Sequence, residues 1–233
     1  MHAIESVRAR SVTSLPESDR QYAVRCLALL GKNVSYGRGQ EICGQSTPAE
    51  SWYRIIVGSV RTYVIRADDR RQIVDLLLPG DFFGFAVGEE YDSAAEAISA
   101  NTLITTYSRR RVEALVDEDP RLARELRCIA VEAHSRLLTQ LLIMGRITAL
   151  EKVGSFILEM ANRLSNGQSD CVVLPISRYD IADYLAISVE TVSRSLTDLQ
   201  NKGIIALSGT RTVRIINRNV LEEGNRTGRI AHV

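Results

Sequence analysis

Residues 177–203 have the pattern of two short helices joined by a tight turn, which constrains the fold of this chain more than any other segment. Ser177 and Asp180 have the spacing of a capping pair that begins the first helix. The turn is expected at residues 186–187, and Gly203 supplies the left-handed residue that ends the second helix. Apolar residues recur at helical spacing and define one inward face in each helix: Ile181, Ala182, Leu185, Val192, Leu196 and Leu199.

The first turn of the second helix is expected to leave polar side chains on its outer side. In a helix-turn-helix, this part of the second helix enters the major groove of DNA. Arg194 can donate two hydrogen bonds to O6 and N7 of guanine, and Glu190 can accept one from the amino group of cytosine. Each such contact discriminates between bases by roughly 1–3 kcal/mol. We therefore predict four base-reading residues: Val189, Glu190, Ser193 and Arg194.

Charge supports DNA binding only locally. The net charge is +1, so the whole chain lacks the basic character of many nucleic-acid-binding proteins. Basic residues nevertheless gather in the C-terminal part: Arg178, Arg194, Lys202, Arg211 and Arg214. Phosphate contacts are predicted for Ser177, Arg178, Ser188, Thr191 and Arg211. The alternative is an ordinary helical hairpin, in which Glu190 and Arg194 form an exposed pair worth about 0.3–0.5 kcal/mol.

The length of 233 residues suits two modest domains, and a hydrophobic content of 45% provides material for two cores. No apolar run approaches the roughly 18 residues of a transmembrane helix. The N-terminus has no apolar signal-peptide core. We therefore expect a cytoplasmic protein with no membrane partner.

The four cysteines are widely scattered, at Cys26, Cys43, Cys128 and Cys171. Their spacing fits neither a zinc nor an iron–sulfur motif, so no metal ligand is predicted. Each cysteine is expected to be a small buried side chain, with a redox-sensing thiol as the alternative. The chain has no phosphate-binding loop, dinucleotide fingerprint or nucleophile elbow. We therefore predict that it is not an enzyme.

The N-terminal half has the pattern of an antiparallel β-structure. An irregular lead and a helix over residues 17–30 come first. Short apolar runs, separated by glycine, proline and aspartate, then follow from Val34 onward. These runs predict a sandwich or jelly-roll barrel. The clearest strands are expected at residues 52–57, 60–65, 72–78 and 103–107.

A long helix is predicted over residues 119–144, and its apolar residues recur in alternating steps of three and four: Leu122, Leu126, Ile129, Ala133, Leu137, Leu141 and Met144. This spacing is that of a coiled-coil seam and favours a homodimer. The alternative is a single helix that packs on the barrel. Gly145 is expected to end the helix and to act as a hinge, and Thr148 with Glu151 begins another helix that runs to about residue 164.

A hairpin wing is predicted near the C-terminal end, because the strand-like residues 204–207 and 212–216 flank a turn at 208–211. Residues 225–233 are expected to be poorly ordered. The fold class is therefore α+β. A β-roll is predicted at residues 1–117, a dimerisation helix at 118–145 and a winged helix-turn-helix domain at 146–233.

This order of elements resembles the Crp–Fnr superfamily of bacterial transcription regulators over essentially the whole chain. The resemblance is carried by LLLPGDFFG at 76–84, by the long helix and by SRYDIADYLAISVETVSR at 177–194. The string ETVSR at 190–194 is similar to the Fnr/FixK-type recognition helix, whereas the cyclic-AMP receptor protein has arginine at the position of Val189. The resemblance implies an inverted repeat of the form TTGAT–N4–ATCAA, a homodimer on double-stranded DNA and recruitment of RNA polymerase.

The resemblance also implies where ligands would bind, and this chain departs from those patterns. Cyclic-nucleotide binders have Gly-Glu where this chain has Gly84–Phe85, and Arg-Ser/Thr where it has Asp92–Ser93. A carboxylate repels a phosphate, and phenylalanine cannot accept a ribose hydroxyl. Residues 1–25 contain no cysteine for an iron–sulfur cluster. We expect no cofactor, as in FixK-type relatives of Fnr. The alternatives are a regulator gated by another small molecule, a thiol redox sensor and a cyclic-nucleotide-type regulatory subunit.

Overall fold

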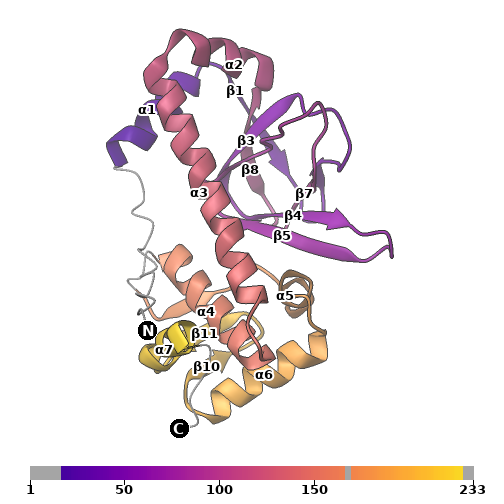
Figure 1. Cartoon of the computed structure of the whole chain (residues 1–233), viewed down its shortest axis with the longest axis vertical. Coiled ribbons are helices and arrows are strands. Elements are labelled where there is room, and N and C mark those ends of the chain that lie inside the picture. Colours follow the sequence, from indigo (N-terminus) through magenta and orange to yellow (C-terminus); the bar gives the residue numbers. More distant parts are fainter. Residues whose placement is uncertain (1–16, 166–168, 228–233) are drawn as a thin grey trace, which may run out of the picture.

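The computed structural model describes residues 17–165 and 169–227. A β-roll lies at one end and a helical domain at the other, and one long helix runs past both (Figure 1). The irregular lead at 1–16, and residues 228–233 of the segment predicted to be poorly ordered, lie outside the described residues. The predicted α+β class with these three parts is confirmed, while the exact domain boundaries stay a prediction.

The roll consists of two four-stranded antiparallel sheets. The first contains, in spatial order, β1 (Gly31–Tyr36), β8 (Thr102–Ser108), β3 (Ser51–Val57) and β6 (Phe82–Phe83). The second contains β2 (Glu41–Cys43), β7 (Ala94–Ala97), β4 (Val60–Ile65) and β5 (Arg71–Leu77). Alternate residues of the strands face inward, and Ile55, Val60 and Ile104 are fully buried there.

Three helices close one end of the roll: α1 (Glu17–Leu27), α2 (Arg109–Glu118) and the long α3 (Pro120–Met144). The predicted first helix is therefore present but ends before residue 30. Helix α2 was not predicted, although Val112, Leu115 and Val116 have helical spacing and pack toward α1 and α3. Asp119 begins α3 by accepting hydrogen bonds from the backbone amides of Arg121 and Leu122.

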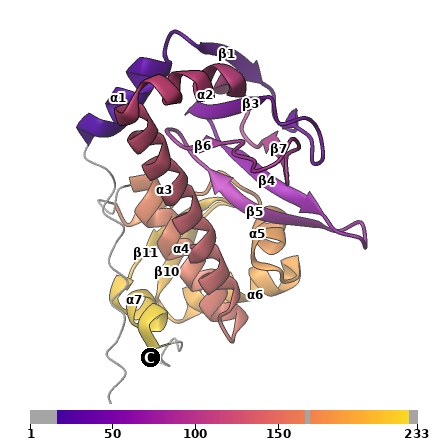
Figure 2. The same cartoon turned by 45° about the horizontal axis from the view of Figure 1, so that its top comes forward.

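The predicted seam of α3 is wrong in its N-terminal half. Leu122, Leu126 and Ile129 are 0%, 6% and 2% exposed and pack inside their own protomer, so a second copy cannot reach them. The physical reason is that α1 and the roll cover this half of the helix (Figure 2). Ala133 and Met144 are half-buried. The large exposed aliphatic side chains of α3 lie from about its midpoint to its C-terminal end: Val131, Leu137, Leu138, Leu141 and Leu142.

The C-terminal domain has four helices and a three-stranded sheet in the described part. These elements are α4 (Ala149–Ser165), α5 (Arg178–Leu185), α6 (Val189–Asn201) and α7 (Arg218–Thr227), with the sheet order β10 (Ile205–Ser208), β11 (Thr212–Ile215) and β9 (Cys171–Val173). The predicted wing is the β10–β11 hairpin. Thr148 and Glu151 exchange the reciprocal bonds of a capping box before α4.

Two elements of this domain were not predicted. Strand β9 extends the wing sheet, and its signal is the apolar run that ends before Pro175. Helix α7 includes residues 225–227, which were expected to be poorly ordered. Its signal is the pair Val220 and Leu221, of which Leu221 is buried in the domain core.

The cysteine prediction holds only in part. Cys26, Cys43 and Cys128 are half-buried, but Cys171 at the start of β9 is exposed. Strand β9 has a burial pattern in which only its middle residue faces the core, so its two ends point outward. Among the described residues, no helix is long and apolar enough to cross a membrane.

Candidate nucleic-acid interface

Helix α5 begins with a complete capping box. The backbone amide of Asp180 donates to Ser177 Oγ at 3.2 Å, and the carboxylate of Asp180 accepts from the backbone amide of Ser177 at 3.1 Å. The helix ends at Ala186, which adopts the left-handed conformation with φ of 52°. The tight turn expected at residues 186–187 is therefore confirmed.

Helix α6 is bounded just as clearly. Ser188 accepts a hydrogen bond from the backbone amide of Thr191 at 3.2 Å and caps the N-terminus. Gly203 has φ of +65° and donates to the carbonyl of Gln200, while Ile204 donates to that of Leu199. These two bonds form a Schellman motif, which ends the helix as predicted.

Packing fixes which side of α6 faces outward. Val192 and Leu199 are fully buried against the domain core, and Leu196 is 4% exposed. Glu190 and Arg194 are exposed on the opposite side. The helix therefore presents its N-terminal turn, with one carboxylate and one guanidinium, to the surroundings.

The other two predicted base-reading residues are less accessible. Ser193 is half-buried, and its hydroxyl accepts a hydrogen bond from Arg178 Nη1 at 3.2 Å. Val189 is half-buried and packs against the core of the domain. The four residues share the first turns of α6, but only Glu190 and Arg194 are exposed.

Hydrogen bonds to the ionised form lower the pKa of Glu190. The largest contribution comes from its own backbone amide, followed by the hydroxyl of Ser188, and the charge of Arg194 acts in the same direction. The carboxylate therefore stays ionised at neutral pH, where it accepts hydrogen bonds only. That is the state needed to recognise an amino group of a base.

The predicted phosphate contacts lie on several elements of the C-terminal domain. Ser188 and Thr191 have their hydroxyl oxygens 3.0 Å apart at the N-terminus of α6, where unpaired amides favour anions. The hydroxyl of Ser177 donates to Asp180 Oδ2 at 2.7 Å, so it already serves the cap of α5. Arg178 and Arg211 are half-buried. These residues come from α5, α6 and the wing, and all lie in one domain.

Tyr179 was missed by the sequence analysis. It lies in the first turn of α5, next to Arg178, and is 70% exposed. The apolar face of α5 is formed by Ile181, Ala182 and Leu185, and this periodicity places residue 179 on the outer side. The spacing could therefore have identified it.

The interior of the roll is occupied by aromatic rings of the chain itself. The rings of Tyr53 and Phe83 stack with centroids 4.9 Å apart, and the hydroxyl of Tyr91 donates to the carbonyl of Ser51 at 2.7 Å. All three aromatic residues are at most 6% exposed. Phe85, at the position where nucleotide binders have glutamate, packs edge-to-face on Trp52 with centroids 5.1 Å apart.

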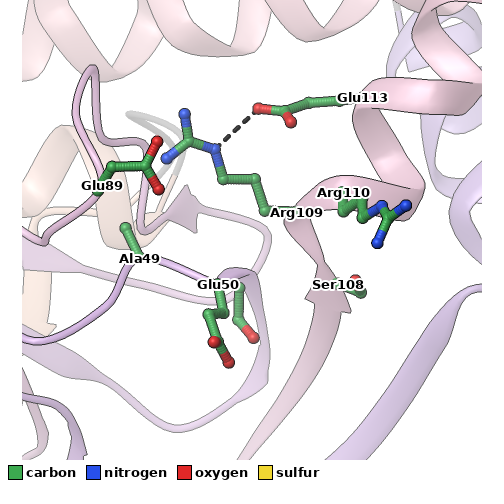
Figure 3. A pocket seen from close by; sticks show the side chains of 8 residues that line it. Ala49, Glu50, Glu89, Ser108, Arg109, Arg110 and Glu113 are labelled. Carbon is green, nitrogen blue, oxygen red and sulfur yellow. Dashed lines mark hydrogen bonds and ion pairs between the residues drawn. The ribbon is translucent and has the colours of Figure 1, made fainter.

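A hollow of about 500 Å³ lies on the outside of the roll, next to α2. Figure 3 shows Arg109 at its centre, with its guanidinium directed to Glu113. Arg109 donates to Glu113 at 2.8 Å and to the carbonyl of Gly88 at 2.7 Å, which uses two of its donors. Glu50 and Glu89 line the same hollow. It lies at the end of the molecule away from α6 (Figure 1).

Comparison with known proteins agrees with this architecture. Residues 33–119 match the cyclic nucleotide-binding domain family, and residues 151–223 match the Crp-like helix-turn-helix domain family. The nitrogen fixation regulation protein FixK of Azorhizobium caulinodans is 39% identical over 219 residues, which cover 93% of this chain and 87% of FixK. The chain belongs to the Crp–Fnr family.

The similarity of this Crp–Fnr protein to FixK proteins covers most of its length. It is 38% identical to FixK2 from Bradyrhizobium japonicum, whose structure superimposes with a TM-score of 0.77 over 83% of this chain and 96% of that one. It is also 34% identical to the transcriptional activatory protein AadR of Rhodopseudomonas palustris, covering 76% of this chain and 75% of AadR. The chain is therefore a FixK-like transcription regulator with a DNA-binding helix-turn-helix.

Proposed function

We propose that this regulator binds as a homodimer to an inverted repeat of the form TTGAT–N4–ATCAA without a small-molecule effector. The observation that carries the proposal is the exposed pair Glu190 and Arg194 in the first two turns of α6. Arg194 donates to guanine, and Glu190 accepts from the cytosine amino group. Ser193 and Val189 complete the reading surface, Ser193 beside Arg178 and Val189 next to a thymine methyl group.

The phosphate contacts position the helix on the duplex. Ser188 and Thr191 lie at the N-terminus of α6, where the helix dipole attracts a phosphate and their hydroxyl groups can bond it. Ser177 and Arg178 contact the backbone from α5, and Arg211 does so from the wing. These contacts add affinity that depends on salt and not on sequence.

The exposed aliphatic stripe in the second half of α3 supports the homodimer. Val131, Leu138, Leu141 and Leu142 are 55%, 47%, 64% and 69% exposed in the single chain. A second copy of this stripe is the partner whose chemistry matches it, because two such helices bury apolar surface symmetrically. The two-fold symmetry of that pair corresponds to the inverted repeat.

The filled interior of the roll supports effector independence, since the rings of Tyr53, Phe83 and Tyr91 occupy it. The name of the relative AadR, a transcriptional activatory protein, supports a role as an activator. Recruitment of RNA polymerase is part of our proposal. We also propose that the protein is not an enzyme. A regulator that binds bacterial DNA acts in the cytoplasm, which is therefore the proposed location.

The test is a titration of DNA duplexes by fluorescence anisotropy, with no small molecule added. Arg194→Ala is expected to weaken binding to the TTGA-type repeat by about 1–3 kcal/mol and to relax the preference at the guanine. Arg111→Ala, on α2 at the far end of the molecule, is the charge-matched control and is expected to bind as the wild type does.

Two outcomes contradict the proposal. Equal losses for Arg194→Ala on matched and scrambled duplexes mean that Arg194 does not read a base. Binding of the wild type that appears only after a small molecule is added favours the ligand-gated regulator.

A further inference from the structure

The first helix of the helix-turn-helix lies against the β4–β5 hairpin of the roll, as both views show (Figures 1 and 2). Charged side chains join the two elements. We propose that four of them, Arg61, Arg71, Asp180 and Asp183, form an interdomain clamp that holds α6 in the orientation required for DNA binding. The proposal rests on the proposed function and adds positioning residues that do not touch DNA.

Arg61 on β4 forms the inner part of the clamp. It donates through Nη1 to Asp180 Oδ1 at 2.6 Å and through Nη2 to Glu96 Oε1 at 2.7 Å. The side chains of Arg61 and Asp180 are 14% and 7% exposed. An ion pair this far removed from water is screened less than a surface pair, and its geometry is held more tightly.

Arg71 on β5 forms the outer part. Its Nη2 lies 3.2 Å from Asp180 Oδ1 and 2.7 Å from Asp183 Oδ2, and its Nε donates to the same oxygen of Asp183 at 3.0 Å. Gln72 adds a hydrogen bond of 2.6 Å to the backbone carbonyl of Asp183. Two consecutive residues of β5 therefore hold one residue of α5 by its side chain and its main chain.

The clamp fixes the rotation of α5 as well as its place. Asp180 is the residue that closes the capping box of α5, so its carboxylate is tied to the start of the helix and to two arginines. Asp183 lies almost one helical turn further on. Gln140 on α3 adds a third attachment, since its amide donates to the carbonyls of Ile73 and Tyr184 at 2.9 and 3.4 Å.

The orientation of α5 determines that of α6, because the two helices share one core. Leu185 of α5 and Val192 of α6 are both fully buried in that core. The clamp residues contact the side of α5 that faces the roll, while Glu190 and Arg194 stay exposed. The clamped orientation is therefore one in which the base-reading surface is free.

Such a clamp acts on the fraction of molecules that are competent to bind. A helix-turn-helix that rotates on its linker has the orientation required for DNA in only a fraction of the molecules. The apparent affinity for DNA is reduced in proportion to that fraction. Contacts within the chain that select the competent orientation remove this cost. In cooperative regulators a ligand supplies that selection, and here the ion pairs supply it.

The test exchanges charges between Arg71 and Asp183, because Asp183 lies outside the capping box. Arg71→Asp and Asp183→Arg are each expected to weaken binding to the operator by on the order of tenfold. The double variant restores the pair with reversed polarity and is expected to recover part of that loss, because the carboxylate at position 71 then also faces Asp180. Arg70→Asp is the charge-matched control, since this neighbour is 82% exposed and contacts only Asp68 among the ion pairs of the described residues.

Hydrogen exchange and a thermal melt are measured for each variant. Faster exchange in α5 with an unchanged melting temperature is expected for the single variants, which separates release of the helix from unfolding. The proposal is overturned if Arg71→Asp lowers the affinity for the operator no more than Arg70→Asp does. It is also overturned if the losses of affinity in the double variant are additive. If the single variants bind the operator more tightly than the wild type, the proposal is also overturned, because the ion pairs then hold the helix-turn-helix in an inactive orientation. If the wild type does not distinguish operator from scrambled DNA, the proposed function itself fails.

Discussion

At the scale of single residues, Glu190 and Arg194 are one helical turn apart, and the charge of Arg194 helps to lower the pKa of Glu190. A depressed carboxyl pKa means that the group remains ionised until the pH falls below its ordinary value of about 4.3. The proposed recognition of a cytosine amino group by Glu190 is therefore expected to be independent of pH over the neutral range. Any pH dependence of operator binding between pH 6 and 8 must come from other groups.

The cysteines give a prediction at the same scale. Burial raises the pKa of the Cys43 thiol to about 12, whereas Cys171 is exposed. At pH 8 the thiolate fraction of Cys43 is lower by on the order of a thousandfold than that of an ordinary thiol with a pKa of about 8.5. Iodoacetamide should therefore modify Cys171 early and Cys43 only after unfolding in urea, as measured by peptide mass spectrometry.

Rapid modification of Cys43 in the native protein contradicts this prediction. That result indicates an open roll interior, since Cys43 packs at the edge of the cluster that contains Tyr53 and Tyr91. It also revives the thiol redox sensor as an alternative function.

At the scale of elements, two glycines that follow helices have different roles. Gly203 after α6 has φ of +65°, which is costly for any residue with a side chain, although nothing lies within 4 Å of an added Cβ. Gly203→Ala is expected to lower the free energy of unfolding by about 1 kcal/mol through backbone strain. The shift of the midpoint of urea unfolding, at an unchanged m-value, measures this loss of stability.

Gly145 after α3 is the matched control. Its φ of −72° is right-handed, so the backbone conformation does not require glycine, and the hinge predicted there has no special conformation. Gly145→Ala is expected to be neutral or to stabilise by about 0.4–1 kcal/mol. A loss equal to that of Gly203→Ala refutes the argument from backbone strain.

The two halves of helix α3 differ in exposure, and the proposed homodimer uses the second half. Leu141→Asp and Leu137→Asp place a charge on the exposed stripe, where the side chains are 64% and 44% exposed. Both are expected to give monomers in analytical ultracentrifugation, because burying an unpaired carboxylate is costly. Val87→Asp, at a fully exposed aliphatic residue of the roll, is the control and should leave the dimer intact. A dimer in the Leu141→Asp variant excludes this stripe as the interface.

Local chemistry explains how much of these elements could be predicted from sequence. Capping residues such as Ser177, Thr148 and Ser188 act within four residues, so their pattern predicted the helix starts correctly. The side of α3 that is covered depends on α1 and the roll, which are distant in sequence. Periodicity therefore located an apolar face but could not distinguish a face buried within the protomer, as at Leu126, from one that is exposed, as at Leu141.

The site shows the same limit. Exposure of Glu190 and Arg194 follows from the spacing of Val192 and Leu199 on α6, and it was predicted. The interdomain contacts of Arg61 and Asp180 join residues separated by 119 positions, and no local pattern marks such a pair. The half-burial of Val189 likewise depends on the core of the whole domain.

At the scale of the whole molecule, a second charged network connects the roll to α3 and α4. Arg136 of α3 lies 3.2 Å from Asp75 and 3.5 Å from Asp81, and Arg163 of α4 lies 2.8 Å from Asp81. Asp75 is only 7% exposed, and burial raises its pKa even though Arg136 and Arg163 act in the opposite direction. The roll, α3 and α4 are therefore joined by one network of ion pairs, in which the loss of one charge affects the others.

Removing one member of this network has a predictable cost. Arg136→Ala leaves Asp75 buried without its main partner and is expected to destabilise the protein by about 3–5 kcal/mol at pH 8. A carboxyl group with a raised folded-state pKa contributes stability that is present at low pH and lost as the pH rises. The destabilisation should therefore be smaller at pH 5 than at pH 8, because protonation at lower pH removes the unpaired charge of Asp75.

Urea unfolding of the single and double variants at both pH values measures this effect. Arg136→Met with Asp75→Leu replaces the pair by apolar groups and is expected to recover most of the loss. A loss for Arg136→Ala that is the same at pH 5 and pH 8 shows that the charge of Asp75 is not responsible.

The rings of Tyr53, Phe83 and Tyr91 inside the roll have a consequence for timing. A regulator that waits for a diffusible ligand changes state in the time that the ligand takes to bind or leave. In the proposed function, the atoms that fill this interior belong to the polypeptide and cannot leave it. Each newly folded copy is then active from the start, and it stays active until it is diluted by growth, degraded or chemically altered. Under this proposal, the lifetime of the protein sets the duration of the transcriptional response.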